Sequence, residues 1–418
     1  LMISSNHYQI MYYFLLISLV AGVVYLIFAI REKSLKEYGK TIGMLALAGV
    51  IGFMPNFSKV YNTYSHSKET IRGGKKLLAS KDQKDEGGLD RSYAMSWSQG
   101  IIESFSVVVP TIRGGSSQEK LADDGAVAKV IGGPRRNQAI MGPTYVGDQP
   151  FLQGVIYFGA AFIFLFILSL FVVEEKIKVW LISVIVLSFF IAWGRHFSIF
   201  TNLLFDYFPL YNKFRTPSMA LTMAGIAVPL LGMLALKTVF SESFDKQRFL
   251  KAFKMAMYVS GGLMLLLVLY GLTDDWTGPK DAEMISKAPW NNDQLYEALR
   301  ADRKSLYLND WTISTVIMII MAASIWFYKK GTLKLPIIVG VLAIIGIGDM
   351  WRVSQRYLNN DSFVPKRQYS NQFAPTPADQ VILADTDPHF RVINVTKNPW
   401  TDGMTCYHHE NIGGHHAA

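Results

Sequence analysis

Cysteine is almost absent from this chain, which has 418 residues and only Cys406. A single cysteine excludes an intramolecular disulfide and any zinc site built on paired cysteines. The sequence also lacks a P-loop, a Rossmann glycine fingerprint, an HExxH zinc motif and a GxSxG nucleophile motif. These absences argue against ATP-driven transport by this chain alone and against the common hydrolase classes, and they indicate no cofactor.

Charge is rare in eight long apolar segments, two of which have a charged residue only at a helix end, Lys254 or Asp349. A bilayer core of about 30 Å requires about 20 apolar residues of helix. One segment contains Lys178, but near its end, where the amine can reach the membrane surface. The segments are approximately 11–30, 41–57, 153–173, 177–194, 216–236, 254–272, 311–328 and 335–350. The sequence therefore predicts an all-α polytopic membrane protein with about eight transmembrane helices.

Basic residues gather in every second connection between these segments. The connections 31–40, 174–178, 237–254 and 329–334 hold 14 Lys and Arg in 39 residues, whereas 1–10, 194–215 and 273–310 hold 8 in 70. By the positive-inside rule, the basic connections face the cytoplasm and both ends of the chain face outward. Topology thus explains much of the net charge of +9, and no nucleic-acid-binding motif is present, so we expect no nucleic-acid partner.

The outward segments suggest two domains. Residues 1–351 form the predicted transmembrane domain, which includes a long extracytoplasmic loop at 58–150. Hydropathy falls after residue 352, and 389–396 is a β-strand candidate, so 352–418 looks like the start of a soluble outer domain containing β-structure. The chain begins without a cationic leader and enters its first span from the outside, so we expect it to be part of a longer protein.

Several outward segments have a composition of their own. Residues 80–90 are polar, whereas 93–115 are apolar and aromatic, and we expect the latter to lie against the membrane surface. Residues 291–303 resemble a short surface helix. Segment 194–215 predicts an amphipathic interfacial helix that breaks at Pro209. Its apolar stripe comprises Phe197, Phe200, Leu203, Leu204 and Tyr207.

Glu103, in SWSQGIIESF, is the candidate catalytic residue. A carboxylate in an apolar segment has a raised proton affinity and can act as a general base. The alternative is a purely structural hydrogen-bonding role. Arg72, Arg113, Arg195 with His196, and Arg215 are candidate substrate-binding residues at the outer membrane boundary. Guanidinium groups suit the phosphate of a lipid carrier, although each could instead anchor the chain to lipid headgroups.

Asp349 is a further candidate for substrate binding, because an ionisable group in a membrane span is often functional. It could equally pair with Arg352 or cap the helix. The histidines at 408, 409, 415 and 416 lack the spacing typical of zinc sites, so we predict no metal site.

A series of short strings resembles the bacterial YfhO-like integral membrane proteins, which belong to the GT-C-type glycosyltransferase superfamily. In chain order they are ETIRGG (69–74), SWSQGIIES with VVPTIRGGSS (96–117), GPTYVGDQPF with GVIYFGA (142–160), WGRHF (193–197), YFPLYNKFRTPSM (207–219), GDMW with RYLNNDSFV (348–364) and YHHENIGGHH (407–416). The resemblance spans essentially the whole chain, and FRTPSM and PTYVGDQPF are its more specific strings.

This resemblance implies a protein of the bacterial cytoplasmic membrane. It would move a sugar from a polyprenyl-phosphate carrier to an extracytoplasmic acceptor, such as an envelope glycan or polymer. Arg72, Glu103, Arg195, His196 and Arg215 match the motifs and are the expected pocket residues. Family members are longer, and the superfamily usually has an essential acidic residue in its first outward loop, which we expect to lie before Leu1.

Two other functions remain open at this stage. A transporter of lipid-linked envelope precursors would have polar or broken helices near the middle of the membrane. Here the polar residues of the spans collect at the outer ends instead. A non-catalytic envelope assembly protein would present its outer domain to partners and would tolerate substitution of Glu103 or Arg215.

Overall fold

The chain folds into two compact units, which are described separately. The computed structural model describes residues 7–68, 70–73, 88–133, 139–286, 289–387 and 389–414. The first unit comprises 1–65 and 87–357, and the second comprises 66–86 and 358–418. The boundary after Tyr357 lies six residues beyond the expected end of the transmembrane domain, because the last long helix continues to that residue.

Seven helical segments within the described ranges are long and apolar enough to cross a membrane. Their principal helices are α1 (Tyr8–Arg31), α2 (Leu35–Phe53), α7 (Glu175–Trp193), α9 (Leu221–Phe240), α10 (Lys246–Thr273), α12 (Asp293–Lys329) and α13 (Leu335–Tyr357). Each is built from apolar runs of the length that a bilayer requires. The predicted all-α, multi-pass class is confirmed.

The third predicted span, 153–173, is helical over only part of its length. Helix α6 (Ala160–Val172) has 13 residues, or about 20 Å at the α-helical rise, which is short for a bilayer core. It starts after Gly159, whose φ of +94° is a conformation that favours glycine. Most of α6 is buried against α9, α10 and α12. The apolar segment 153–173 therefore contains a short helix in the core of the bundle and does not form a full-length span.

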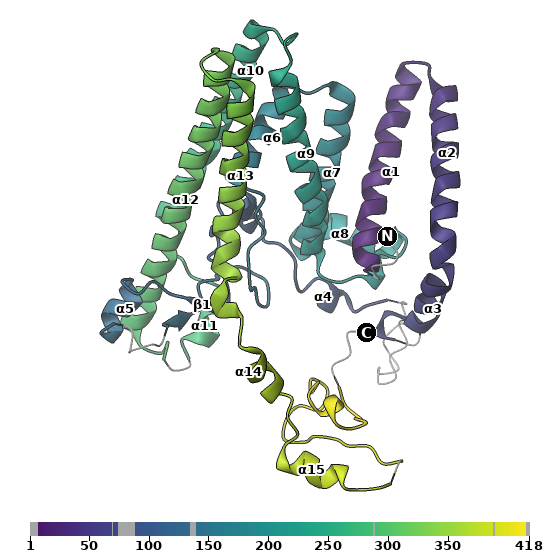
Figure 1. The fold of residues 1–418 in the computed structure, drawn as a ribbon, viewed down its shortest axis with the longest axis vertical. Coiled ribbons are helices and arrows are strands. Elements are labelled where there is room, and N and C mark those ends of the chain that lie inside the picture. The colour runs from purple at the N-terminus through teal and green to yellow at the C-terminus, as the bar shows by residue number, and fades with distance from the viewer. Residues whose placement is uncertain are drawn as a thin grey trace. The chain divides into compact units, whose positions relative to one another are not determined.

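The basic connections lie together at one end of the first unit, at the top of Figure 1, where α1 turns into α2 and α12 turns into α13. We call this the basic end. The long outward segments lie at the opposite end, the loop end. This arrangement is the one expected from the alternation of charge along the chain.

The loop end contains short elements. They are η1 (Met54–Asn56), α3 (Phe57–Ser67), α4 (Arg91–Ala94), η3 (Ile102–Val107), β1 (Glu119–Lys120), α5 (Ala126–Ile131), β2 (Met141–Gly142), η4 (Gly194–Phe197), α8 (Ser198–Tyr207), η5 (Tyr211–Lys213), η6 (Pro217–Ala220) and α11 (Asp281–Met284). The two strands pair antiparallel, with Glu119 opposite Gly142 and Lys120 opposite Met141. Most of the polar stretch 80–90 lies outside the described residues.

The apolar stretch 93–115 is built into the core of the bundle. Val108, Val109 and Ile112 are almost completely buried and pack in the main hydrophobic cluster. The expectation that this stretch lies against the membrane surface is therefore wrong for these residues. Apolar composition alone does not distinguish burial in protein from burial in lipid.

Two predicted surface helices differ in their outcome. Helix α8 is present and ends at Tyr207, two residues before Pro209. Its predicted apolar stripe is divided, because Phe200 and Leu204 pack on the core whereas Leu203 and Tyr207 are exposed. Residues 291–303 are not a separate helix, since 293–303 form the first turns of α12 and pack against α5.

The second unit has little regular structure. Its short helices are η2 (Ile71–Gly73), η7 (Asn360–Ser362), α14 (Lys366–Asn371), α15 (Pro377–Leu383) and η8 (Thr405–Tyr407). The strand expected at 389–396 is limited to an isolated bridge between Val392 and Asn411. A Phe373–Tyr407 ring contact, with centroids 4.4 Å apart, holds α14 and η8 together.

Candidate functional site at the loop end

Glu103 lies in η3 and is buried, with 4% of its surface exposed. Its carboxylate accepts three hydrogen bonds. The Gly100 N–H donates to Oε2 at 3.2 Å, the Tyr145 hydroxyl donates to Oε1 at 2.9 Å, and Gln149 Nε2 donates to Oε1 at 3.0 Å. Buried carboxylates need such partners, because an unpaired one would be very costly.

Two of these partners, Tyr145 and Gln149, come from the segment 142–151, which contains the string GPTYVGDQPF. Gln149 Nε2 also donates to Gln99 Oε1 at 3.1 Å, and Gln99 Nε2 donates to the Glu103 carbonyl at 3.1 Å. The Tyr145 hydroxyl accepts from the Gln149 N–H at 3.0 Å. Two loops far apart in the sequence are thus joined through one carboxylate and two amides.

Burial raises the pKa of Glu103 above that of an ordinary glutamate. Its three hydrogen bonds act in the opposite direction, and the nearby Asp148 carboxylate raises the pKa further. The sequence-based expectation of a raised proton affinity at Glu103 therefore has a structural cause in its burial.

Asp148 is a second carboxylate at this site, and sequence reasoning missed it. A Cβ placed on Gly100 would lie 3.2 Å from Asp148 Oδ2 and 3.3 Å from Glu103 Oε2, so both carboxylates occupy the space beside this glycine. Unlike Glu103, the Asp148 side chain is 40% exposed. Gly100, in SWSQG, could have signalled a close approach, but nothing in the sequence showed that its neighbour was an aspartate.

Two side chains, Arg195 and His196, contact Asp148, and a third, Lys280, contacts the next residue, Gln149. Arg195 donates from Nη2 to the Asp148 carbonyl at 2.6 Å, and His196 Nε2 lies 3.7 Å from Asp148 Oδ2. His196 Nε2 is buried and has no hydrogen-bond partner among the residues that the structure describes, since 3.7 Å is too long for one. Lys280 Nζ donates to the Gln149 carbonyl at 3.1 Å. The pair Arg195 and His196, predicted from sequence, therefore joins the Glu103 site through Asp148.

The position of these groups is fixed by close backbone packing. Gly194 has a φ of +44°, and a Cβ there would lie 2.1 Å from Ser98 Oγ. The same hydroxyl accepts from the Arg195 N–H at 3.0 Å, and the Gln99 N–H donates to the Ala192 carbonyl at 2.8 Å. The end of α7 is thereby tied to the loop that carries Glu103.

Arg113 borders the same cavity as Glu103, but its guanidinium is engaged by protein groups. It donates to the Tyr270 hydroxyl at 2.7 Å, to Asp274 Oδ2 at 3.2 Å and to the Val146 carbonyl at 2.8 Å. The glycine beside it serves packing, because a Cβ on Gly114 would lie 1.9 Å from the Thr144 carbonyl oxygen. Arg113 thus fixes the 142–151 loop to α10.

Arg215 lies between aromatic rings. Its guanidinium carbon is 5.6 Å from the Tyr93 ring centroid and 5.9 Å from that of Trp97, and it donates to the Tyr93 hydroxyl. The Arg215 carbonyl accepts from Gln9 Nε2 at 2.6 Å. Cation–π contacts of this kind leave part of a guanidinium available to an anion.

Asp349 belongs to a neighbouring ionic network. It accepts from the Tyr157 hydroxyl at 2.7 Å and lies 3.7 Å from Arg352 Nη2. Arg352 and Arg356 both contact Asp310, which is fully buried, at 2.6 to 3.0 Å. Asp349 therefore pairs with Arg352, which was one of the predicted alternatives. Its role in substrate binding stays a prediction. Thr111 also donates to Asp310 at 2.9 Å, which links the network to the outer loop.

Two hollows at the loop end share one lining residue, and the first of them is lined by Glu103. The first, next to the carboxylate, has water-accessible space of about 10 Å³, which is enough for one water molecule. The second is an apolar groove between α9, α13 and residues 156–162, with water-accessible space of about 410 Å³. Ile156 lines both hollows.

Arg72 and the histidines belong to the second unit. Arg72 lies in η2, where its N–H donates to Thr70 Oγ1 at 3.2 Å. His409 Nε2 is 2.9 Å from Asp379, and His408 bonds the Phe373 carbonyl, whereas residues 415 and 416 lie outside the described ranges. Among the residues described, no group of three or more His, Cys, Asp and Glu side chains could hold a metal ion.

Comparisons of the chain with protein-family models, curated proteins and solved structures find no match.

Proposed function

We propose that this chain carries a glycosyltransferase site on the outer face of the bacterial cytoplasmic membrane. It would move a sugar from a polyprenyl-phosphate carrier to an envelope glycan or polymer, as the resemblance to YfhO-like, GT-C-type proteins implies. The observation that carries the proposal is the pair of carboxylates at Gly100, with Arg195 and His196 at Asp148 and Lys280 at the neighbouring Gln149 carbonyl.

The arrangement suits an inverting displacement. The acceptor hydroxyl oxygen forms a bond to the anomeric carbon while the bond from that carbon to the carrier phosphate breaks. The hydroxyl proton passes to a carboxylate, and the phosphate leaves with the bonding electron pair. Charge develops on the leaving phosphate, where fixed cations stabilise the transition state most.

Each residue receives a role from its exposure and contacts. Asp148 is the base, because its carboxylate reaches solvent, whereas buried Glu103 positions the 142–151 loop through its hydrogen bonds with Tyr145 and Gln149. Arg195 and Lys280 are both exposed, and they hold the phosphate of the carrier. Arg215 contributes at the aromatic edge of the loop end, and Arg113 and Asp349 maintain the walls. Arg72 lies in the second unit, and its assignment to the pocket stays a prediction.

The carrier's hydrocarbon tail would occupy the apolar groove that ends at Ile156. The membrane therefore surrounds the protein and also supplies the lipid-linked sugar donor. Such a groove at the loop end is also the feature that separates this proposal from transport of a lipid-linked precursor, which needs polar groups near the middle of the membrane.

The test is a lipid and glycan analysis of cells that lack the full-length gene. The expected result is accumulation of a polyprenyl-phosphate sugar together with loss of that sugar from an envelope polymer. The wild-type gene should reverse both changes, and Asp148→Asn should reverse neither at equal membrane abundance. Glu297→Gln, on the exposed face of α12, is the matched control and should behave as wild type.

An unchanged lipid-linked sugar pool and unchanged envelope glycans would contradict glycosyl transfer. That result would favour the transporter or the assembly protein. Full rescue by Asp148→Asn alongside a real transfer defect would instead keep the reaction and remove Asp148 as its base.

A further inference from the structure

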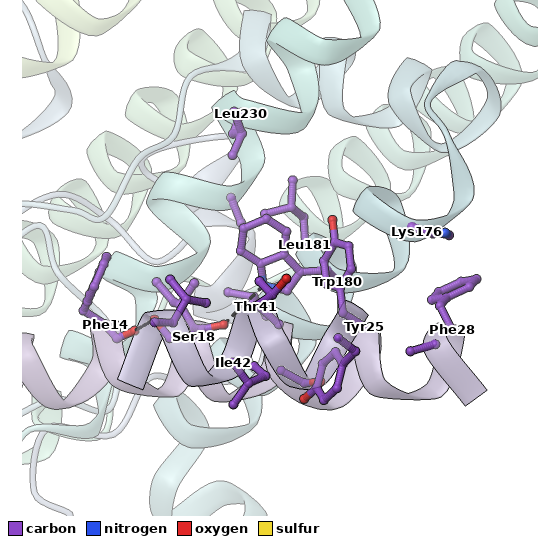
Figure 2. A pocket seen from close by; sticks show the side chains of 18 of the residues that line it. Phe14, Ser18, Tyr25, Phe28, Thr41, Ile42, Lys176, Trp180, Leu181 and Leu230 are labelled. Carbon is purple, nitrogen blue, oxygen red and sulfur yellow. Dashed lines mark hydrogen bonds between the residues drawn. The ribbon is translucent and has the colours of Figure 1, made fainter. Parts of the chain in front are cut away.

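A second, larger groove lies away from the loop-end site. It has water-accessible space of about 670 Å³ and separates the α1–α2 hairpin from α7 and α9. Figure 2 shows it along α1, with Phe14 and Ser18 towards one end and Lys176 and Phe28 towards the other. Trp180, Leu181 and Leu230 contribute from the facing helices.

The apolar walls of this groove lack packing partners within the described part of the protein. No residue of α2 is buried, and the principal contacts of α2 within the bundle are with α1. Apolar side chains around an unfilled space lose their dispersion contacts on one side, and a space lined in this way does not hold ordered water. A hydrocarbon chain is the occupant that restores these contacts.

Three polar side chains in the apolar part of the groove have hydrogen-bond partners within the protein. The Trp180 indole donates to the Ile17 carbonyl at 3.2 Å, and the Tyr38 hydroxyl donates to the Gly22 carbonyl at 3.0 Å. Ser18 Oγ donates to the Phe14 carbonyl at 3.1 Å. These side chains therefore present hydrocarbon surface to the groove and select against a polar ligand along its length.

Charged groups gather only at the basic end of the groove. Lys176 Nζ lies 2.6 Å from Glu32 Oε2, and Glu37 also lines the groove, beside Ser34. The lining thus combines one cation with two carboxylates. A ligand that is apolar along most of its length and carries both a negative and a positive group at one end matches this pattern.

We propose that the groove binds one membrane phospholipid with an amine-containing, zwitterionic headgroup. Its phosphate contacts Lys176, its ammonium contacts Glu37, and its acyl chains run along α1 towards Phe14. The bound lipid joins the α1–α2 hairpin to α7 and α9. This inference does not depend on the proposed glycosyl transfer.

The first experiment measures lipid binding to the purified chain in detergent by native mass spectrometry. Phosphatidylethanolamine and phosphatidylglycerol with identical acyl chains are compared. We expect at least about tenfold tighter binding of one phosphatidylethanolamine. Ser18→Trp, which places a large ring in the groove, should weaken this binding at least about tenfold.

Leu19→Trp is the matched control, because Leu19 is the next residue of α1, is 53% exposed and does not line the groove. Its lipid affinity should stay within about twofold of wild type. Equal binding by the two tryptophan variants would overturn the groove as the site. Equal affinity of the wild type for the two lipids would overturn the assignment of the headgroup.

A second measurement does not require a groove-filling variant to fold. Phosphatidylethanolamine with brominated acyl chains should quench part of the tryptophan fluorescence of the wild type, since Trp180 lines the groove. Trp180→Phe should remove the component that saturates at stoichiometric lipid. A saturable component of unchanged size in Trp180→Phe would contradict the proposal.

Discussion

The loop end of the bundle and the α1–α2 hairpin are built from different interactions. At the loop end, buried carboxylates such as Glu103 and Asp310 are held by directed hydrogen bonds from several segments. In the hairpin, α2 buries no residue, and its glycines have open space around them. At the loop end, most substitutions of a buried polar residue should destabilise the fold. In the hairpin, substitutions that keep the helices apolar and equally long should have little effect on stability.

The difference shows where the chain concentrates its chemistry. A polar network has a defined geometry because each unsatisfied buried group is costly. An apolar helix in lipid can slide or tilt with little change in free energy. A reaction site therefore belongs at the loop end, and a lipid-filled contact belongs at the hairpin. Four substitutions test this contrast.

The largest effect is expected from Asp310→Ala. This change leaves Arg352 and Arg356 without their shared carboxylate in a buried place, which typically costs about 3–5 kcal/mol. Thermal unfolding in detergent measures the loss. Glu297→Ala is the control, because its pair with Arg300 is exposed and is worth about 0.2–1 kcal/mol. Similar losses of stability in the two variants would show that the buried ion pairs of Asp310 contribute no more than the exposed pair of Glu297 does.

Gly271→Ala should have the next largest effect. A Cβ there would lie 2.0 Å from the ring of Tyr307, which is fully buried and whose hydroxyl donates to the Leu267 carbonyl at 2.6 Å. Because that hydrogen bond restrains the ring, overpacking should cost about 1–3 kcal/mol. A lowered unfolding temperature with retained secondary structure is the expected observation. No loss of stability would mean that α10 and α12 can separate freely.

Glu103→Gln should change how stability depends on pH. The pKa of Glu103 is raised, so between about 4.5, its usual value, and the raised value the folded state holds a proton that the unfolded state releases. Stability due to this group is therefore present at low pH and is lost as the pH rises. Unfolding temperatures across this range should fall less steeply in the Gln variant than in the wild type. Parallel curves would contradict the raised pKa.

Gly43→Ala in α2 should have the smallest effect, and of opposite sign. Nothing lies within 4 Å of a Cβ at this position, and alanine favours helix over glycine by about 1 kcal/mol. The variant should unfold at the same or a slightly higher temperature, as measured by circular dichroism. Clear destabilisation would reveal that another helix packs closely against this face of α2.

The sequence predicted the long helices well and the short elements poorly. Apolar runs of fixed length and alternating charge identify spans one by one, as at α10 and α12. The first turns of α12 and the half-length α6 were misjudged, since whether Leu299 or Ile163 faces protein, lipid or water depends on contacts from distant segments. The strand expected near Val392 also needed a partner that local propensity does not specify.

The candidate site shows the same limit. Glu103, Arg195 and His196 could be selected from residue type and position, and the structure brings them near one another. Asp148 could not be selected from the sequence, because an aspartate in a turn-rich loop is ordinarily a turn residue. Its role as a partner of Glu103 arises from the space that Gly100 leaves for two carboxylates.

The sequence by itself determined the helical, membrane-spanning class of this protein and the separation of a basic end from a loop end. Hydrophobic length and net charge act over whole segments and require no partner. Only the tertiary structure decided that Glu103 and Asp148 adjoin, that Arg113 is engaged by Tyr270 and Asp274, and that a groove separates the α1–α2 hairpin from α7. Hydrogen bonds and close packing act over a few ångströms, so they depend on which distant residues the fold brings together.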